Sequence, residues 1–301
     1  MEELLQQVTN GLAIGGVYAL VALGYTMVYG VLRLINFAHG ELFTLGAYLG
    51  FTFLTSAALG PRLGTGWGLL LLALLVAGLV AVSGALLERA AYRPLREAPR
   101  LSAVVSALGA SIFLQNALML GWGARFQVYP DEALPTSAVT LGGTRVPVVR
   151  LAVILVSLAL MAALWLFVNR TKLGTAIRAV ALDRDAARLC GIDVDQVVRA
   201  VFLVGPALGG VAGLMVGLTY GQIGFTMGWS YGMKAFTAAI LGGIGNVPGA
   251  MLGGFLLGLA ESLGSAYVSS AWKDAIAFVV LIVVLLVRPT GILGERVAEK
   301  A

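Results

Sequence analysis

The sequence predicts an all-α fold: a polytopic transmembrane helical bundle with about eight spans, within a range of about eight to ten. Hydrophobic residues make up 59% of the 301 residues, charged residues only 12%, and the mean hydropathy is +0.93. A soluble domain carries about twice that share of charge. The uncharged stretches are also long enough to cross a bilayer, which takes about 20 apolar residues. This composition excludes a soluble enzyme and a disordered chain.

Charged or proline-containing stretches divide the chain into candidate spans. The sequence predicts spanning helices within residues 8–31, 34–59, 63–87, 101–124, 151–168, 200–233, 235–260 and 271–287. A small β-hairpin is expected at 139–149, inside a longer polar loop. The whole chain, 1–301, is expected to form one transmembrane domain, with approximate halves at 1–124 and 150–301.

The distribution of Lys and Arg predicts the orientation, because basic residues collect in cytoplasmic loops. Fourteen of the twenty bases fall at Arg33, in 88–100, in 169–199 and after residue 287. With these parts cytoplasmic, the N-terminus lies outside and the C-terminus inside. Residues 220–271 must then leave the outer side and return to it. The segment 242–249 therefore either turns inside the membrane or joins two short crossings.

Two interruptions, at 36–41 and 242–249, correspond weakly between the halves. Paired interruptions indicate a transport path between inverted repeats, because irregular backbone is tolerated at membrane depth only inside protein or beside water. The candidate path residues are Asn36, His39, Glu41, Gly242, Gly243, Asn246 and Pro248. Two alternatives stay open. The glycines also suit tight helix packing, and Asn36, His39 and Glu41 also suit a helix N-terminus.

The segment 169–199 is the most charged part of the chain. Residues 182–191 predict a short helix, with Asp183 as its N-cap and Gly191 ending it, and Asp193 is placed to cap the next helix. Such a helix is either a docking element for a soluble partner or an ordinary solvated loop.

Several kinds of chemistry are absent from the sequence. One histidine and one distant cysteine cannot form a metal site, no phosphate-binding Gly-rich loop is present, and no catalytic set is credible. We therefore expect no enzyme and no cofactor in this chain. Glu261 is expected at the outer end of a span as an interfacial residue. The near absence of charge within the spans argues against an ion-coupled secondary transporter.

The residues at 34–48 resemble the opening motif of the branched-chain amino acid ABC transporter permeases. Residues 240–250, followed by Gly253-Gly254 and 258–261, resemble the second motif of that family. Arg178-Ala179, Ala186-Ala187 and Gly191-Ile192 are similar to its cytoplasmic coupling segment, and 288–291 to its C-terminal end. The resemblance runs in order along nearly the whole chain, and it is to the shorter of the two permeases that pair in this system.

The resemblance implies a multi-pass permease of the bacterial inner membrane that imports leucine, isoleucine or valine by alternating access. It implies a second permease subunit, in a hetero- or homodimer, two cytoplasmic subunits that bind ATP and Mg²⁺, and a periplasmic substrate-binding protein, with no nucleic acid. The candidate ATPase-coupling residues are Arg178, Asp183, Arg184, Ala186, Ala187, Arg188 and Gly191. Relatives that carry urea, amides or other amino acids, and an ATP-independent secondary transporter, remain the alternatives.

Overall fold

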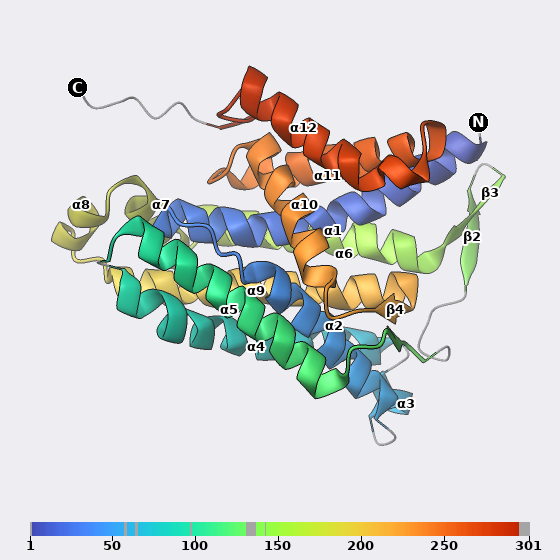
Figure 1. Ribbon diagram of the computed structural model, residues 1–301, viewed down its shortest axis with the longest axis horizontal. Coiled ribbons are helices and arrows are strands. Elements are labelled where there is room, and N and C mark those ends of the chain that lie inside the picture. Colours follow the sequence, from blue (N-terminus) through green and yellow to red (C-terminus); the bar gives the residue numbers. More distant parts are fainter. Residues whose placement is uncertain are drawn as a thin grey trace.

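The computed structural model describes residues 2–294 except 57–58, 64–65, 97, 131–136 and 142. It confirms an all-α helical bundle (Figure 1). The elements are α1 (Glu2–Leu32), α2 (His39–Thr55), α3 (Gly60–Leu63), α4 (Trp67–Leu87), η1 (Glu88–Tyr92), η2 (Arg93–Leu95), α5 (Arg100–Trp122), β1 (Gln127–Val128), β2 (Ala138–Leu141), β3 (Thr144–Pro147), α6 (Val148–Arg170), α7 (Lys172–Leu182), α8 (Arg184–Leu189), α9 (Val194–Tyr220), β4 (Gln222–Ile223), α10 (Met227–Gly242), α11 (Val247–Tyr267), η4 (Ser270–Trp272) and α12 (Lys273–Val287).

Among the described residues, seven helices are long and apolar enough to cross a membrane. They comprise α1, α4 with its η1–η2 extension, α5, α6, α9, α11 and α12, so a count of eight is not confirmed. The shortfall lies in α2 and α10, which have 17 and 16 residues. At about 1.5 Å per residue, each is only about 25 Å long.

The predicted boundary at Lys234 was wrong. The sequence placed one span before this lysine and one after it, but Lys234 lies within α10. The chain instead turns on either side of α10, where Gly221 (φ +68°) follows α9 and Gly243 (φ +108°) ends α10. Positive φ angles are accessible to glycine at little cost, so these glycines end the helices and the lysine does not.

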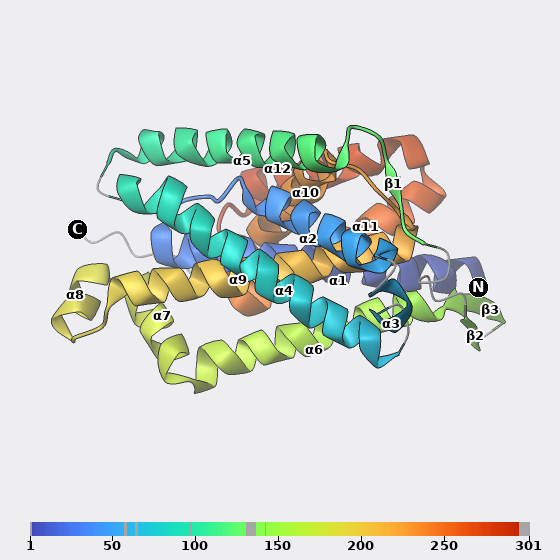
Figure 2. The same cartoon turned by 90° about the horizontal axis from the view of Figure 1, so that it is seen from below.

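Helix α1 is the central helix of the bundle. In its most apolar window, 94% of the residues are buried, and it packs against α11, α9, α6 and α10. In contrast, α4, α5, α6 and α12 lie at the periphery and expose many leucine, valine and phenylalanine side chains (Figures 1 and 2). An apolar exterior around a closely packed centre is what a lipid environment requires.

The two ends of the bundle differ in charge. We call the end that carries η1, η2, α7, α8 and the start of α9 the arginine-rich end (Figure 2). The opposite, N-terminal end carries the start of α1, the antiparallel β2–β3 hairpin and the short β1–β4 pair. The hairpin confirms the prediction at 139–149. The loops predicted to be cytoplasmic thus share one end of the molecule.

Glycines set the distance between α1 and α11. A Cβ atom added at Gly258 would lie 2.4 Å from the Cα atom of Gly15, and one added at Gly254 would lie 2.5 Å from the Cα atom of Ala19. Backbone thus meets backbone along this contact, the arrangement that small residues permit between membrane helices.

We expect Gly258→Val to lower the free energy of unfolding by at least about 1–3 kcal/mol, because the backbone of α1 cannot move out of the way. Gly78→Val, on the exposed face of α4 with no atom within 4 Å of its Cβ position, is the matched control and should cost little. Unfolding of the purified chain in detergent measures both. Equal stability of the two variants would contradict backbone packing at this contact.

Candidate functional site

The break between α1 and α2 contains Asn36, which is 1% exposed. Its side-chain Oδ1 accepts a hydrogen bond of 2.8 Å from the Tyr92 hydroxyl of η1. The helix that follows has Ala38 at its N-cap position and no capping side chain. The alternative in which Asn36 or His39 caps α2 is therefore wrong, and Asn36 instead holds the break against η1.

His39 and Glu41 lie at the start of α2, and both are buried. The imidazole of His39 stands edge-on to the Tyr25 ring of α1, with centroids 4.9 Å apart. The Oε2 atom of Glu41 has no hydrogen-bond partner among the described residues. Ser111 of α5 hydrogen-bonds to the same carboxyl group, and Glu41 lies in the first turn of α2, where the helix dipole favours a carboxylate. Its place in a transport path stays a prediction.

The second interruption, between α10 and α11, forms a tight junction at the arginine-rich end. Asn246 caps α11 by accepting a 2.9 Å hydrogen bond from the Gly249 amide, and its Nδ2 donates to the Leu293 carbonyl. Gly242 packs on Gly249, while Gly243 packs on the backbone after α12. Tight packing through small residues, the alternative to a role in a transport path, accounts for both Gly242 and Gly243.

The junction also shows how the chain turns at 242–249. Pro248, at the start of α11, is exposed, and α10 and α11 run as two separate helices on either side of the turn. Of these two helices, α11 is long and apolar enough to cross a membrane, and α10, with 16 residues, is not among the candidate spans. The assignment of Asn246 and Pro248 to a transport path stays a prediction.

The two short helices α2 and α10 cross in close contact beside α1. A Cβ atom added at Gly228 of α10 would lie 2.4 Å from the carbonyl oxygen of Gly40 in α2. In Figure 1, α10 runs steeply across the direction of α1 and α11. Helix α2, which follows the first break, and helix α10, which precedes the second, are therefore packed together at the centre of the bundle.

A cluster of paired charges lies inside the bundle. Lys234 of α10 is 7% exposed and Glu261 of α11 is 0% exposed, with 2.9 Å between Nζ and Oε1. The Tyr18 hydroxyl of α1 donates a 2.7 Å hydrogen bond to Oε2 of Glu261. Lys273 approaches Oε1 of Glu261 at 3.3 Å, and Asp274 approaches Lys234 at 2.6 Å.

This cluster corrects two expectations. Glu261 is fully buried and paired instead of facing the surroundings of the bundle, and α10 and α11 each carry a buried charge. An unpaired charge at this depth would be expensive, so the two residues occur together and tie α1, α10, α11 and α12 into one unit. The sequence did contain a signal. Lys234 and Glu261 each stand alone in a long uncharged stretch, but their mutual partnership was not visible.

The predicted coupling segment has the expected local structure. Oδ1 of Asp183 accepts hydrogen bonds from the amides of Asp185 and Ala186 at 2.9 and 3.0 Å, which caps α8. Gly191, with φ +82°, follows the helix. Asp193 caps α9 in the same way.

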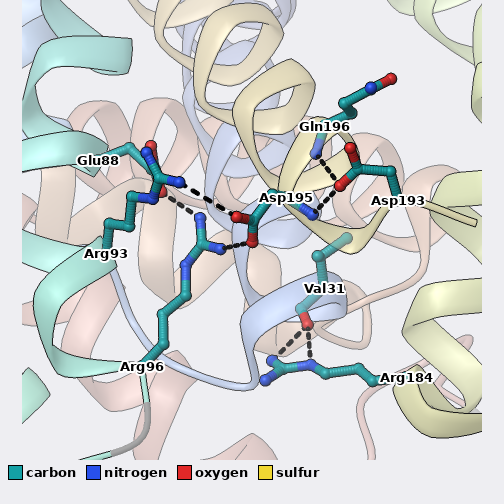
Figure 3. Close-up of polar contacts among 8 residues, drawn as sticks. All are labelled: Val31, Glu88, Arg93, Arg96, Arg184, Asp193, Asp195 and Gln196. Atoms are coloured by element: carbon teal, nitrogen blue, oxygen red, sulfur yellow. Dashed lines mark hydrogen bonds and ion pairs between the residues drawn. The ribbon is translucent and has the colours of Figure 1, made fainter. Parts of the chain in front are cut away.

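Two residues expected to face a partner instead face this chain. The guanidinium of Arg184 donates from Nε and Nη2 to the Val31 carbonyl at the end of α1, with 3.0 Å from Nε (Figure 3). That carbonyl is one of the last four of the helix, which lack an intrahelical partner. Burial, and then the nearby positive charges led by Arg96, lower the pKa of Arg184. Ala187 is 4% exposed and packs into the core.

The outward surface of α8 is made by other residues. Ala186 and Arg188 are exposed, and so are Leu182 and Leu189, at 83% and 90%. Arg178 lies on the exposed side of α7 and donates to Asn169 at 3.0 Å. Sequence reasoning missed both leucines. The available signal was an apolar residue on either side of the charged stretch at 183–188.

A second ionic network joins η1 and η2 to the start of α9 (Figure 3). Arg96 bridges the buried Glu88 and Asp195, while Arg93 approaches Asp195 at 3.3 Å. Together with the hydrogen bonds from Arg184 of α8 to the end of α1, these contacts connect the arginine-rich end to the two long central helices, α1 and α9. No cluster of metal-ligating residues occurs in the part of the chain that the structure describes.

A lipid-facing bundle with interrupted helices, buried polar groups and an exposed helix at one end is the architecture of a membrane transport permease. Residues 7–285 match the family described as the branched-chain amino acid transport system permease component, and the chain belongs to this family.

Named relatives cover nearly the whole chain. The high-affinity branched-chain amino acid transport system permease protein LivH of Escherichia coli (strain K12) is 45% identical over 98% of this chain and 97% of the relative. BraD of Pseudomonas aeruginosa is 44% identical over the same shares. A probable LivH of Methanocaldococcus jannaschii is 27% identical over 91% of this chain and 88% of its own. No solved structure matches the chain significantly.

We expect Lys234→Met to lower the free energy of unfolding by about 3–5 kcal/mol, because it removes one partner from a buried ion pair. The double variant Lys234→Met/Glu261→Gln should recover part of that loss. Arg188→Gln, in an exposed pair at 3.7 Å, is the control and should cost less than about 1 kcal/mol. Denaturant titration in detergent micelles measures all three. A loss in Lys234→Met no larger than in the control would contradict a stabilising role of the cluster.

Proposed function

We propose that this chain is the membrane-spanning permease subunit of an ATP-driven importer of leucine, isoleucine and valine in the bacterial inner membrane. The likeness to the named branched-chain amino acid permeases, across almost the whole length of each chain, supports the substrate class. The structural observation that carries the proposal is the attachment of the exposed helix α8 to the end of α1 through Arg184.

In this proposal the chain itself hydrolyses no ATP. Two cytoplasmic partner subunits bind ATP and Mg²⁺, a second permease subunit completes the membrane part, and a periplasmic protein delivers the amino acid. Leu182 at the end of α7 and Leu189 at the end of α8 supply an apolar contact surface, and Arg178 and Arg188 supply positive charge for acidic groups of an ATP-binding subunit. Such exposed leucines suit a contact that is buried in the assembly.

The attachment of α8 gives that contact a mechanical consequence. A displacement of α8 passes to α1 through the hydrogen bonds from Arg184 to Val31. Arg33, which directly follows α1, also donates to the Ala181 carbonyl of the adjoining helix α7 at 2.9 Å. Helix α8 also contacts α9 directly, and the Arg93, Arg96 and Asp195 ion pairs join the start of α9 to η1 and η2. Helices α1 and α9 both pack against α2. A movement of α1 and α9 therefore shifts the buried start of α2, and in this way it opens and closes a path between the two halves.

The orientation can be tested with the native cysteine. Cys190 follows α8 and is exposed, and we expect the arginine-rich end to face the cytoplasm. A membrane-impermeant maleimide should therefore label Cys190 in inverted vesicles and leave it unlabelled in intact spheroplasts. The control is Cys190→Ser/Arg125→Cys, which should show the reverse pattern. Labelling of Cys190 from outside would overturn the orientation.

The docking role of α8 predicts a loss of transport without a loss of folding. In cells that lack their own copy of the chain, Leu189→Asp should lower ATP-dependent uptake of radiolabelled leucine about tenfold, corresponding to ~1.4 kcal/mol of lost contact. Leu4→Asp, an exposed leucine at the N-terminal end, is the matched control and should retain uptake. Equal uptake by both variants would contradict docking at α8. Uptake that survives ATP depletion but stops when the proton gradient collapses would contradict an ATP-driven importer.

A further inference from the structure

A cavity of about 180 Å³ lies at the N-terminal end of the bundle, between α1, α6, α9, α11 and the start of α12. One part of its wall is aliphatic. It is formed by Ala13, Ile14, Val17, Val153 and Val216. The other part carries amide, hydroxyl and charged groups, so the cavity presents an apolar surface and a polar surface to the same small volume.

The charged groups at this cavity leave an excess of positive charge. Arg150, at the start of α6, makes no ion pair with any residue that the structure describes. Lys273 reaches Glu261, but that carboxylate is already held by Lys234 and Tyr18. Among the residues that line the cavity, two cations, Arg150 and Lys273, face the single carboxylate of Glu261. The cavity therefore favours a ligand that brings one negative charge.

The cavity also offers a hydrogen-bond acceptor. Asn10 lines it, and its Oδ1 atom is buried with no hydrogen-bond partner among the described residues. The rim is half open, since Tyr220 is 52% exposed and the Lys273 side chain 43%. A rim of charged and polar groups suits water rather than lipid, so a soluble ligand can enter from this end.

We propose that this cavity is a binding site for an α-amino acid with an aliphatic side chain. Arg150 and Lys273 hold the carboxylate, Oδ1 of Asn10 accepts a hydrogen bond from the ammonium group, and the aliphatic wall at Ile14, Val17 and Val153 receives the side chain. The inference rests on the proposed import function, in which the N-terminal end receives the substrate from outside. It places a substrate site beside the buried cluster rather than at the helix breaks.

The site selects by charge as well as by shape. A zwitterion matches an unpaired cation and an unpaired acceptor at once, whereas an amide or an ester of the same amino acid lacks the anion. Removing the cation should therefore abolish the preference for the free carboxylate more than it affects the apolar contact. This difference separates a ligand-binding Arg150 from a merely structural one.

The test uses photo-leucine, a diazirine analogue of leucine, on the purified full-length chain in detergent. We expect cross-links in residues 13–17 and around Val153 and Val216. Excess leucine should suppress them at least about tenfold more effectively than leucinamide, which lacks the carboxylate. Arg150→Gln should lower the labelling about tenfold and remove this discrimination, and Arg150→Lys should retain part of both.

Arg145→Gln is the matched control, because Arg145 is exposed in the hairpin at the same end and lies outside the cavity. Ala13→Leu fills the cavity without changing its charge and should also abolish labelling; melting temperatures confirm that each variant folds. Cross-links elsewhere, or labelling of these peptides that excess leucine does not suppress, as expected of a lipid headgroup in the cavity, would overturn the inference. Leucine uptake by cells carrying the wild-type chain tests the proposed function separately, since uptake with labelling elsewhere refutes the site alone.

Discussion

Helix α1 packs against α11 so closely that backbone meets backbone at Gly15 and Gly258. In lipid there is little hydrophobic gain from bringing two apolar helices together, so such a contact depends on close packing between small residues. It fixes α1 at the centre of the bundle, with α9, α6 and α10 around it. The buried charges, the helix breaks and the exposed helix α8 are all positioned relative to this one helix.

Because α1 has 31 residues, it is about 46 Å long and reaches from one end of the bundle to the other. Its first half lines the cavity at the N-terminal end and hydrogen-bonds Glu261 through Tyr18. Its middle packs on His39 through Tyr25, and its last turn receives Arg184 of α8. A single rigid element thus connects the proposed substrate cavity with the proposed docking helix.

The polar groups inside the bundle are divided into two kinds. Lys234, Glu261 and Tyr18 satisfy one another, which lets them persist away from water and holds the three helices α1, α10 and α11 together. Oε2 of Glu41 and Oδ1 of Asn10 lack hydrogen-bond partners among the described residues. The first kind explains stability, and the second marks where a ligand or a second conformation supplies the missing partner. The N-terminal cavity and the start of α2 each contain such an atom.

The sequence by itself determined the features that depend on neighbouring residues. The helix cap at Asp183, the glycine stop at Gly191 and the hairpin near 139–149 need only local geometry, and the lipid-facing class follows from composition alone. Only the tertiary structure decided which distant residues meet. It paired Lys234 with Glu261, turned Arg184 toward α1 and divided the chain at Gly221 instead of Lys234, because these outcomes depend on contacts between helices far apart in sequence.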